Sequence, residues 1–110
     1  MISTRSIEAS AENGALTVTC SGDLDLHVAE KLQSALEEAR ESKSATVDFR
    51  AVSYIDTAIA AVLISTARTL QNTDHRLKVI ATNGSHPQYV LRIMGLAALM
   101  DIEVVEGTSE

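Results

Sequence analysis

Residues 45–64 read ATVDFRAVSYIDTAIAAVLI, and this segment carries the strongest signal for the fold class. Its first five residues are short and rich in strand formers, so they predict a strand. Arg50 to Ile55 are expected to form a loop or turn, after which Asp56 can cap a helix that runs to about Asn72. Residues 58–64 are apolar almost all round this helix, which predicts burial on more than one side. A buried strand followed by a buried helix is typical of an α/β domain.

Two strands and one helix are expected before this stretch. Residues 6–11 predict a first strand, and residues 15–21 alternate apolar and polar side chains as in a half-buried second strand. Asn13-Gly14 between them is a strong hairpin signal, because both positions tolerate positive φ. Gly22 to Asp25 breaks the alternation. Apolar residues then recur at three and four positions, which predicts an amphipathic helix over roughly Leu26 to Glu41.

Two further strands and a helix are expected after it. Leu77 to Ala81 predicts a fourth strand, and Ile102 to Val105 a short fifth one. Between them, Ser85 can cap a helix over about His86 to Met94, and Gly95 can end it. The order is therefore β-β-α-β-α-β-α-β. It predicts a single α/β domain over residues 1–110, with a mixed, mostly parallel sheet, right-handed crossovers and helices packed on the sheet.

Composition limits the class of partner and the compartment. The 110 residues carry a formal charge of −6 and only 3% aromatic residues, so the core must be aliphatic. Nucleic acid and anionic membranes both favour a basic surface, so neither is expected as a partner. The single cysteine, Cys20, cannot form an intrachain disulfide, and the first ten residues lack the apolar core of a secretory signal. A cytoplasmic protein without direct membrane insertion is expected.

The usual motifs of catalysis and metal binding are missing from the sequence. It contains no G-x-G-x-x-G, no G-x-x-x-x-G-K and no nucleophile elbow. His27, His75 and His86 are far apart, and none has a second His or Cys at ligand spacing. His27 and His75 are expected at solvated surface positions. No catalytic residue, metal or cofactor is therefore predicted, and the chain is not expected to be an enzyme.

Asp56 and Thr57 form the one pattern that suggests a function. They place a carboxylate and a hydroxyl at the mouth of a helix, where free N–H groups carry a partial positive charge. A phosphate on Thr57 would be stabilised by that field, although Asp56 would repel it. The simpler alternative is that the two residues only cap the helix and begin its first turn. Spacing alone leaves both interpretations open.

Three motifs in order resemble the STAS domain family. They are Gly22-Asp23-Leu24-Asp25-Leu26, then Val47-Asp48-Phe49 followed by Val52-Ser53-Tyr54-Ile55-Asp56-Thr57, and Val90-Leu91-Arg92-Ile93-Met94-Gly95-Leu96. The resemblance covers about Ile7 to Val105. The family it points to includes the bacterial anti-sigma factor antagonists. It implies a partner-switching regulator that binds an anti-sigma factor with serine/threonine kinase activity, with a PP2C-type phosphatase as a further partner. The resemblance does not specify an oligomeric state.

The resemblance also implies site residues. Thr57 matches the phosphoacceptor hydroxyl of the family, and phosphorylation there would release the partner. Asp23 is a candidate partner contact, and Asp25 is a candidate for both a contact and a helix cap. The acidic residues are expected at one end of the sheet, where they could steer a basic partner. The full set of expected partner-binding residues is Asp23, Asp25, Asp56, Thr57, Ala58 and Ile59.

The sequence departs from the antagonist pattern after Thr57. Ala58 replaces a Ser or Thr, and Ile59 and Ala61 replace two common glycines. Because a β-branched Ile needs more room than Gly, the change indicates a bulkier surface or deeper packing. It keeps two alternatives open. One is a small STAS subunit that binds the cytoplasmic ATPase of a lipid ABC transporter, and the other is a stressosome-type scaffold domain.

Overall fold

The computed structural model describes residues 5–107 and shows one five-stranded sheet whose strands follow their sequence order. The strands are β1 (Ser6–Glu12), β2 (Ala15–Leu24), β3 (Ser44–Ile55), β4 (Leu77–Thr82) and β5 (Asp101–Val105). The helices are α1 (Ala29–Ala35), α2 (Thr57–Thr69) and α3 (His86–Ile93), with short 3-10 turns η1 (Leu26–Val28), η2 (Glu37–Glu41), η3 (Leu70–Asn72) and η4 (Leu96–Ala98). The predicted element order and the mixed, mostly parallel sheet are confirmed, since only β1 runs antiparallel to its neighbour.

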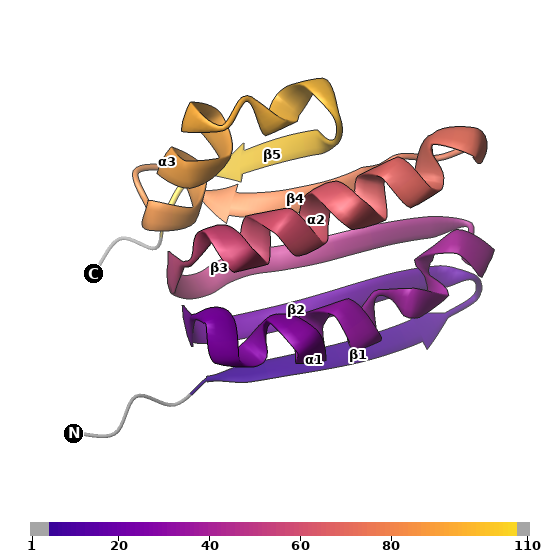
Figure 1. Ribbon diagram of the computed structural model, residues 1–110, viewed down its shortest axis with the longest axis horizontal. Helices are drawn as coiled ribbons and strands as arrows, with labels where there is room; N and C mark the ends of the chain where they lie inside the picture. Colours follow the sequence, from indigo (N-terminus) through magenta and orange to yellow (C-terminus); the bar gives the residue numbers. More distant parts are fainter. Residues whose placement is uncertain (1–4, 108–110) are drawn as a thin grey trace.

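Helices α1 and α2 both lie over the same face of the sheet (Figure 1). This follows from the strand order, because right-handed parallel connections that keep moving in one direction across a sheet leave their helices on one side. The strands alternate accordingly. Along β3, Ala45, Val47 and Phe49 are buried, whereas Thr46 and Arg50 belong to the opposite, polar face.

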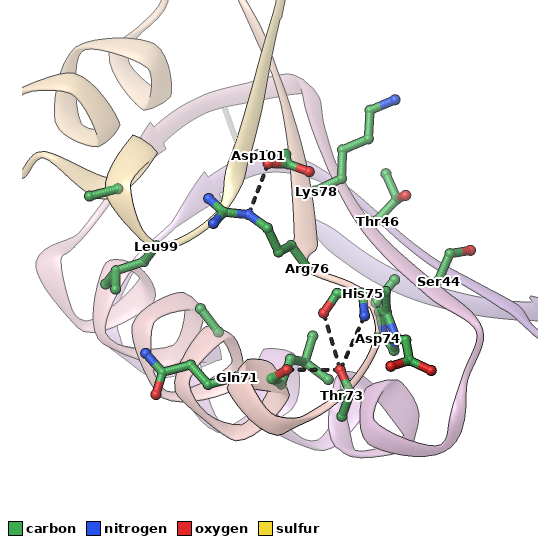
Figure 2. Close-up of a pocket in the computed structure, with 14 residues that line it drawn as sticks. Ser44, Thr46, Gln71, Thr73, Asp74, His75, Arg76, Lys78, Leu99 and Asp101 are labelled. Carbon is green, nitrogen blue, oxygen red and sulfur yellow. Dashed lines mark hydrogen bonds and ion pairs between the residues drawn. The ribbon is translucent and has the colours of Figure 1, made fainter.

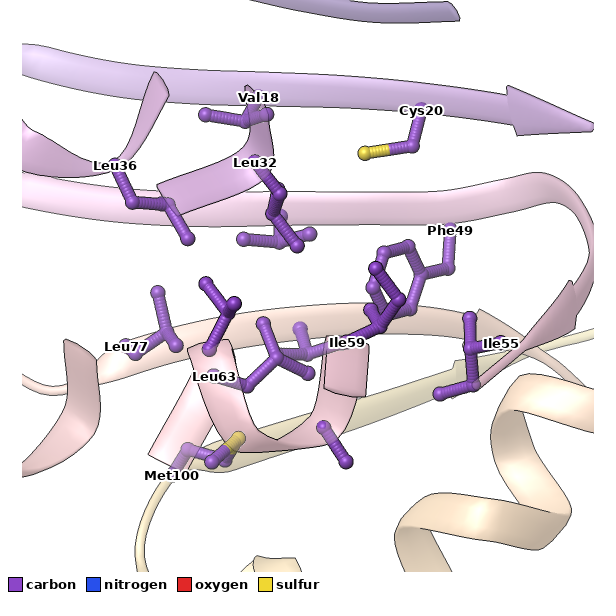
Figure 3. Close-up of a cluster of buried hydrophobic side chains, with 14 of the residues drawn as sticks. Val18, Cys20, Leu32, Leu36, Phe49, Ile55, Ile59, Leu63, Leu77 and Met100 are labelled. Atoms are coloured by element: carbon purple, nitrogen blue, oxygen red, sulfur yellow. The ribbon is translucent and has the colours of Figure 1, made fainter. Parts of the chain in front are cut away.

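The core between the sheet and the helices is aliphatic, as the composition predicts. Figure 3 shows side chains from β2, β3, α1 and α2 meeting in this layer, with Leu32 and Leu63 approaching from the helices. Phe49 is the one aromatic side chain that is fully buried among residues 5–107, while Tyr54 and Tyr89 are exposed. Burial of Val, Leu and Ile side chains at about 1.5–3 kcal/mol each supplies the main stabilising contribution.

The hairpin between β1 and β2 forms where Asn13-Gly14 predicts it. Asn13 has φ 54° and Gly14 has φ 85°, so both central residues adopt the left-handed region that a two-residue turn requires. The turn fixes the β1–β2 register, in which Glu12 pairs with Ala15 and Ser6 with Ser21.

Two expected breaks in the strands are wrong. The segment 50–55 continues β3 instead of forming a loop, and residues 22–24 continue β2 beside it, with Gly22 opposite Val52 and Leu24 opposite Ile55. Register shifts interrupt this part of the ladder, so the alternation of side chains is lost while the pairing persists. Alternation of apolar and polar residues is the sequence signal of a strand. Because it is lost here, the sequence alone does not predict that the two strands continue.

The expected long helix over residues 26–41 is interrupted. Asp25 caps η1 by accepting a hydrogen bond from the His27 N–H at 2.9 Å, and α1 then covers only Ala29–Ala35 before η2 follows. The other two helices begin where expected, and α2 ends at Thr69 with η3 completing the segment to Asn72. Leu32 in α1 and Leu36 and Ala39 after it are all buried, so the interrupted segment still packs an apolar face on the core.

Candidate functional site

Thr57 is the first residue of α2 and its side chain is exposed. The preceding Asp56 is the N-cap, and its carboxylate accepts a hydrogen bond from the Ala58 N–H at 2.8 Å. The Thr57 hydroxyl lies 3.4 Å from the same carboxylate oxygen. The hydroxyl is therefore open to a partner or a modifying enzyme, at a helix end whose dipole favours added negative charge.

The end of β2 lies beside Asp56. The Asp56 N–H donates to the Leu24 carbonyl at 2.9 Å, and the Ser53 hydroxyl donates to the Asp23 carboxylate at 2.5 Å. These contacts bring the exposed Asp23 and the partly exposed Asp56 to the same end of the sheet, as the sequence predicts. This end, where β2, β3 and β4 finish, lies at the left of Figure 1 and is called the Thr57 end below.

Asp25 lies close to this end but its carboxylate is already engaged. One oxygen accepts from the Arg5 guanidinium at 2.8 Å, and the other accepts from the His27 N–H. The hydrogen bond from the Arg5 side chain is the main cause that lowers the pKa of Asp25 below its ordinary value. The structure thus gives Asp25 a capping role in addition to its expected place near the site.

Ile59 was expected at the partner surface, and the structure corrects this. Its side chain is 0% exposed, because it points from α2 into the core shown in Figure 3. Ala58 stays partly exposed, and Ala61 is exposed one turn beyond Thr57. The bulk that replaces the family glycine at position 59 is therefore absorbed by deeper packing.

His86 and Tyr54 complete the Thr57 end, although sequence reasoning gave neither a role. The His86 Nδ1 accepts a hydrogen bond from the Ile55 N–H at 3.1 Å. Its ring stacks on Tyr54 with the ring centroids 4.7 Å apart and the planes inclined by 21°. The sequence offers one faint signal, because a histidine at the start of a helix that follows a parallel strand lies at the same sheet end as the other strand–helix junctions.

Large apolar side chains are exposed around this end. Leu26, which follows the β2 end in η1, is 65% exposed, and Tyr54 of β3 is 40% exposed. On the neighbouring α3, Tyr89 and Ile93 are spaced by four residues and are 51% and 62% exposed. Exposed apolar side chains next to polar ones are a frequent property of protein-binding surfaces.

A cavity lies at the opposite end of the sheet, where β3, β4 and β5 begin (Figure 2). This cavity of about 620 Å³ is bordered by Ser44, Arg76 and Asp101, and the two charged groups pair with each other at 3.0 Å. His75, expected at a solvated position, is only partly exposed, and its Nε2 is buried without a hydrogen-bond partner among the described residues. None of the predicted site residues borders this cavity.

Further side chains with reactive or ligand-forming groups give no second site. Within residues 5–107, no helix is long and apolar enough to cross a bilayer, and no three His, Cys, Asp or Glu side chains gather as metal ligands would. Cys20 is buried, and burial raises the pKa of its thiol to about 12, with the nearby Asp48 carboxylate adding to the effect. Such a thiol is unreactive at neutral pH.

A mixed sheet covered by helices, with an exposed hydroxyl at the start of α2, defines a small α/β domain with a candidate binding or modification site at a helix end. A family model described as "Mlab, STAS domain" matches residues 7–105, so the chain belongs to the STAS domain family. No curated protein matches the chain.

Solved structures share the fold at low sequence identity. An anti-sigma factor antagonist from Mycobacterium paratuberculosis is 18% identical with a TM-score of 0.79, over 91% of this chain and 86% of that one. A putative anti-sigma factor antagonist from Thermotoga maritima is 11% identical with a TM-score of 0.70, over 88% and 85%. The Bacillus cell fate determinant SpoIIAA in its phosphorylated form is 17% identical with a TM-score of 0.64, over 96% and 93%.

Proposed function

We propose that the chain is a regulatory binding protein of a partner-switching system. Its partner is an anti-sigma factor with serine/threonine kinase activity, and Thr57 is the residue that this kinase phosphorylates. The observation that carries the proposal is the exposed Thr57 hydroxyl at the first position of α2, in a STAS domain whose fold matches anti-sigma factor antagonists.

Phosphorylation at this position would change the charge of the docking surface. A phosphate adds about −1.5 to −2 charges, and here it would join the carboxylates of Asp56 and Asp23 at one end of the sheet. Burying such a group against a partner costs desolvation and repulsion unless the partner supplies matching positive charge. The unphosphorylated form therefore binds the anti-sigma factor, and the phosphorylated form releases it.

The exposed side chains of the Thr57 end also indicate what kind of partner surface would bind there. Leu26 and Tyr54 offer exposed apolar area beside the site, and Asp23 and Asp56 add negative charge. A partner surface whose apolar part faces Thr57, and whose basic residues lie only at the rim opposite Asp23, fits both features and leaves a phosphate on Thr57 without matching positive charge. Ala58 is small and partly exposed, so it allows the partner to approach the hydroxyl of Thr57 closely.

Phosphopeptide mass spectrometry tests the proposal. The protein is incubated with the cognate kinase and ATP, and a phosphate is expected on Thr57 in the wild type and on no residue in Thr57→Ala. A PP2C-type phosphatase is expected to remove it. Ser44→Ala removes a hydroxyl from the opposite end and serves as the control, which should be phosphorylated like the wild type. An unmodified Thr57 with an active kinase would overturn the proposal.

A second candidate is a subunit that binds the cytoplasmic ATPase of a lipid ABC transporter. The observation that favours it is the buried Ile59 in place of a glycine, since the antagonist pattern departs here while Asp56 and Thr57 remain. Co-purification distinguishes the two. An ATPase that binds the wild type and Thr57→Glu equally well supports the transporter subunit, whereas loss of partner binding in Thr57→Glu supports the switch.

A further inference from the structure

We propose that His86 is a positioning residue for the Thr57 site, and that it acts by holding the backbone of Ile55 immediately before the start of α2. The proposal rests on the proposed function for the role of Thr57, but the contact itself is tested without any partner.

The Ile55 N–H needs an acceptor that the sheet does not provide. β4 pairs with β3 only over residues 45–48, so the later part of β3 has a strand neighbour on the β2 side alone. Successive N–H groups of an extended chain point to opposite sides. The Asp56 N–H points to β2 and reaches the Leu24 carbonyl at 2.9 Å. The Ile55 N–H points the other way, where His86 Nδ1 accepts it at 3.1 Å.

His86 is itself held in place from two sides. It follows Ser85, the N-cap of α3, whose hydroxyl donates to the Thr82 carbonyl at 2.6 Å and accepts from the Gln88 N–H at 3.3 Å. Its ring lies against Tyr54 in a stacked arrangement. An imidazole that accepts at Nδ1 carries its proton on Nε2, so the hydrogen bond also selects the tautomer.

The consequence for Thr57 follows from the short chain between the two contacts. Only Asp56 separates Ile55 from Thr57, and Asp56 is anchored to β2 through its N–H and to α2 through its carboxylate. The start of α2 is therefore fixed from the β2 side by Leu24 and from the α3 side by His86. Loss of either anchor frees the backbone that presents the Thr57 hydroxyl.

Two substitutions separate the hydrogen bond from the packing of the ring. His86→Phe keeps an aromatic ring to stack on Tyr54 but has no acceptor. His86→Asn loses the ring but carries an amide oxygen at the same number of bonds from Cα as Nδ1, so it can accept from the Ile55 N–H. Leu99→Ala, at the opposite end of the sheet, is the control for a general loss of stability.

Amide hydrogen exchange and the ¹⁵N–¹H spectrum of the free protein provide the measurement. In His86→Phe the Ile55 amide is expected to exchange about tenfold faster than in the wild type, as for a lost hydrogen bond, and the Thr57 and Ala58 amide signals are expected to move. His86→Asn should restore slow exchange and the wild-type signals, and Leu99→Ala should change neither.

Unchanged Ile55 exchange in His86→Phe, no rescue in His86→Asn, or stationary Thr57 and Ala58 signals would each overturn the positioning role. These results do not depend on a kinase. An unphosphorylated Thr57 in the kinase experiment would overturn the proposed function while leaving the result for His86 intact.

Discussion

The two ends of the parallel sheet differ in how they are built. At the Thr57 end, three strand–helix junctions meet and are tied together by hydrogen bonds from Asp56 to β2 and from Ile55 to His86. At the opposite end, a cavity of about 620 Å³ is lined by polar and apolar side chains, among which Arg76 and Asp101 pair with each other. The cavity lies at one end, and the exposed apolar side chains of Leu26 and Tyr54 lie at the other, beside the Thr57 hydroxyl.

The proposed docking surface is therefore not at the end that carries this cavity. A protein partner needs exposed apolar area and a rigid frame, both of which the Thr57 end provides through Leu26, Tyr54 and the anchored start of α2. At the opposite end, the charges of Arg76 and Asp101 are matched by each other. The comparison can be tested by equivalent substitutions at the two ends.

The largest expected effect is on stability and comes from a substitution of Ile59. This substitution distinguishes a role in the core from a role in partner binding. Ile59→Ala should lower the free energy of unfolding by about 3 kcal/mol, because it leaves a cavity where the side chain is fully buried. The partner affinity of the folded protein should stay the same. Urea unfolding and titration calorimetry below the transition measure the two quantities. If Ile59→Ala had wild-type stability but bound the partner weakly, Ile59 would be a partner contact and not a core residue.

Truncation of a leucine at each end tests the docking surface directly. Leu26→Ala should weaken partner binding about tenfold and hardly change stability, because the side chain is exposed. Leu99→Ala at the opposite end should leave the affinity unchanged, although it lowers stability through its partly buried side chain. Equal losses of affinity for the two variants, measured by calorimetry, would remove the distinction between the ends.

The N-cap of α2 should contribute less to the free energy of unfolding than the Ile59 side chain does. Asp56→Ala removes the acceptor for the Ala58 N–H and should cost about 1 kcal/mol of unfolding free energy. Asp74→Ala changes an exposed carboxylate at the opposite end and should stay within about 0.5 kcal/mol. Chemical denaturation of both variants provides the comparison, and an Asp56→Ala protein as stable as Asp74→Ala would show that the cap is energetically silent.

The smallest expected effect is a pH-dependent change in the free energy of unfolding. It comes from the pair of Asp48 and Arg50 on β3, between the two ends. The hydrogen bond from the Arg50 side chain is the main cause that lowers the pKa of Asp48 in the folded protein. Because the folded pKa lies below the unfolded one, the contribution is complete above the unfolded pKa and is lost as the pH falls through the folded pKa.

Its size should be about 0.5 kcal/mol, since the exposed guanidinium is screened by solvent. The wild type should therefore lose slightly more unfolding free energy than Asp48→Asn between pH 7 and pH 2.5, as measured by urea unfolding. A larger loss in Asp48→Asn would reverse the sign and contradict the assignment.

Much of the fold could be predicted because its signals are local. The Asn13-Gly14 hairpin, the Asp56 and Ser85 caps and the order of strands and helices all depend on neighbouring residues, and the structure has each of them. The Asp56 cap and the apolar run after it placed Thr57 at the start of a helix, where the structure also has it.

The remaining features depend on contacts between distant segments. The extension of β3 to Ile55 requires a bulged pairing with β2, and the His86 hydrogen bond requires α3 to pack beside the end of β3. Ile59 lies on a helix that is apolar almost all round, so its sequence does not tell which side faces the sheet. Position in the fold, not residue type, decides these three cases.

We propose that the Thr57 end binds the partner and that a charge at Thr57 switches this binding off. The most direct measurement is the affinity of the anti-sigma factor for the wild type, Thr57→Ala, Thr57→Glu and, at the opposite end, Ser44→Glu. We expect equal binding by the wild type, Thr57→Ala and Ser44→Glu, and about 100-fold weaker binding by Thr57→Glu, because a charge is buried without a partner. Equal affinity for all four proteins would contradict it.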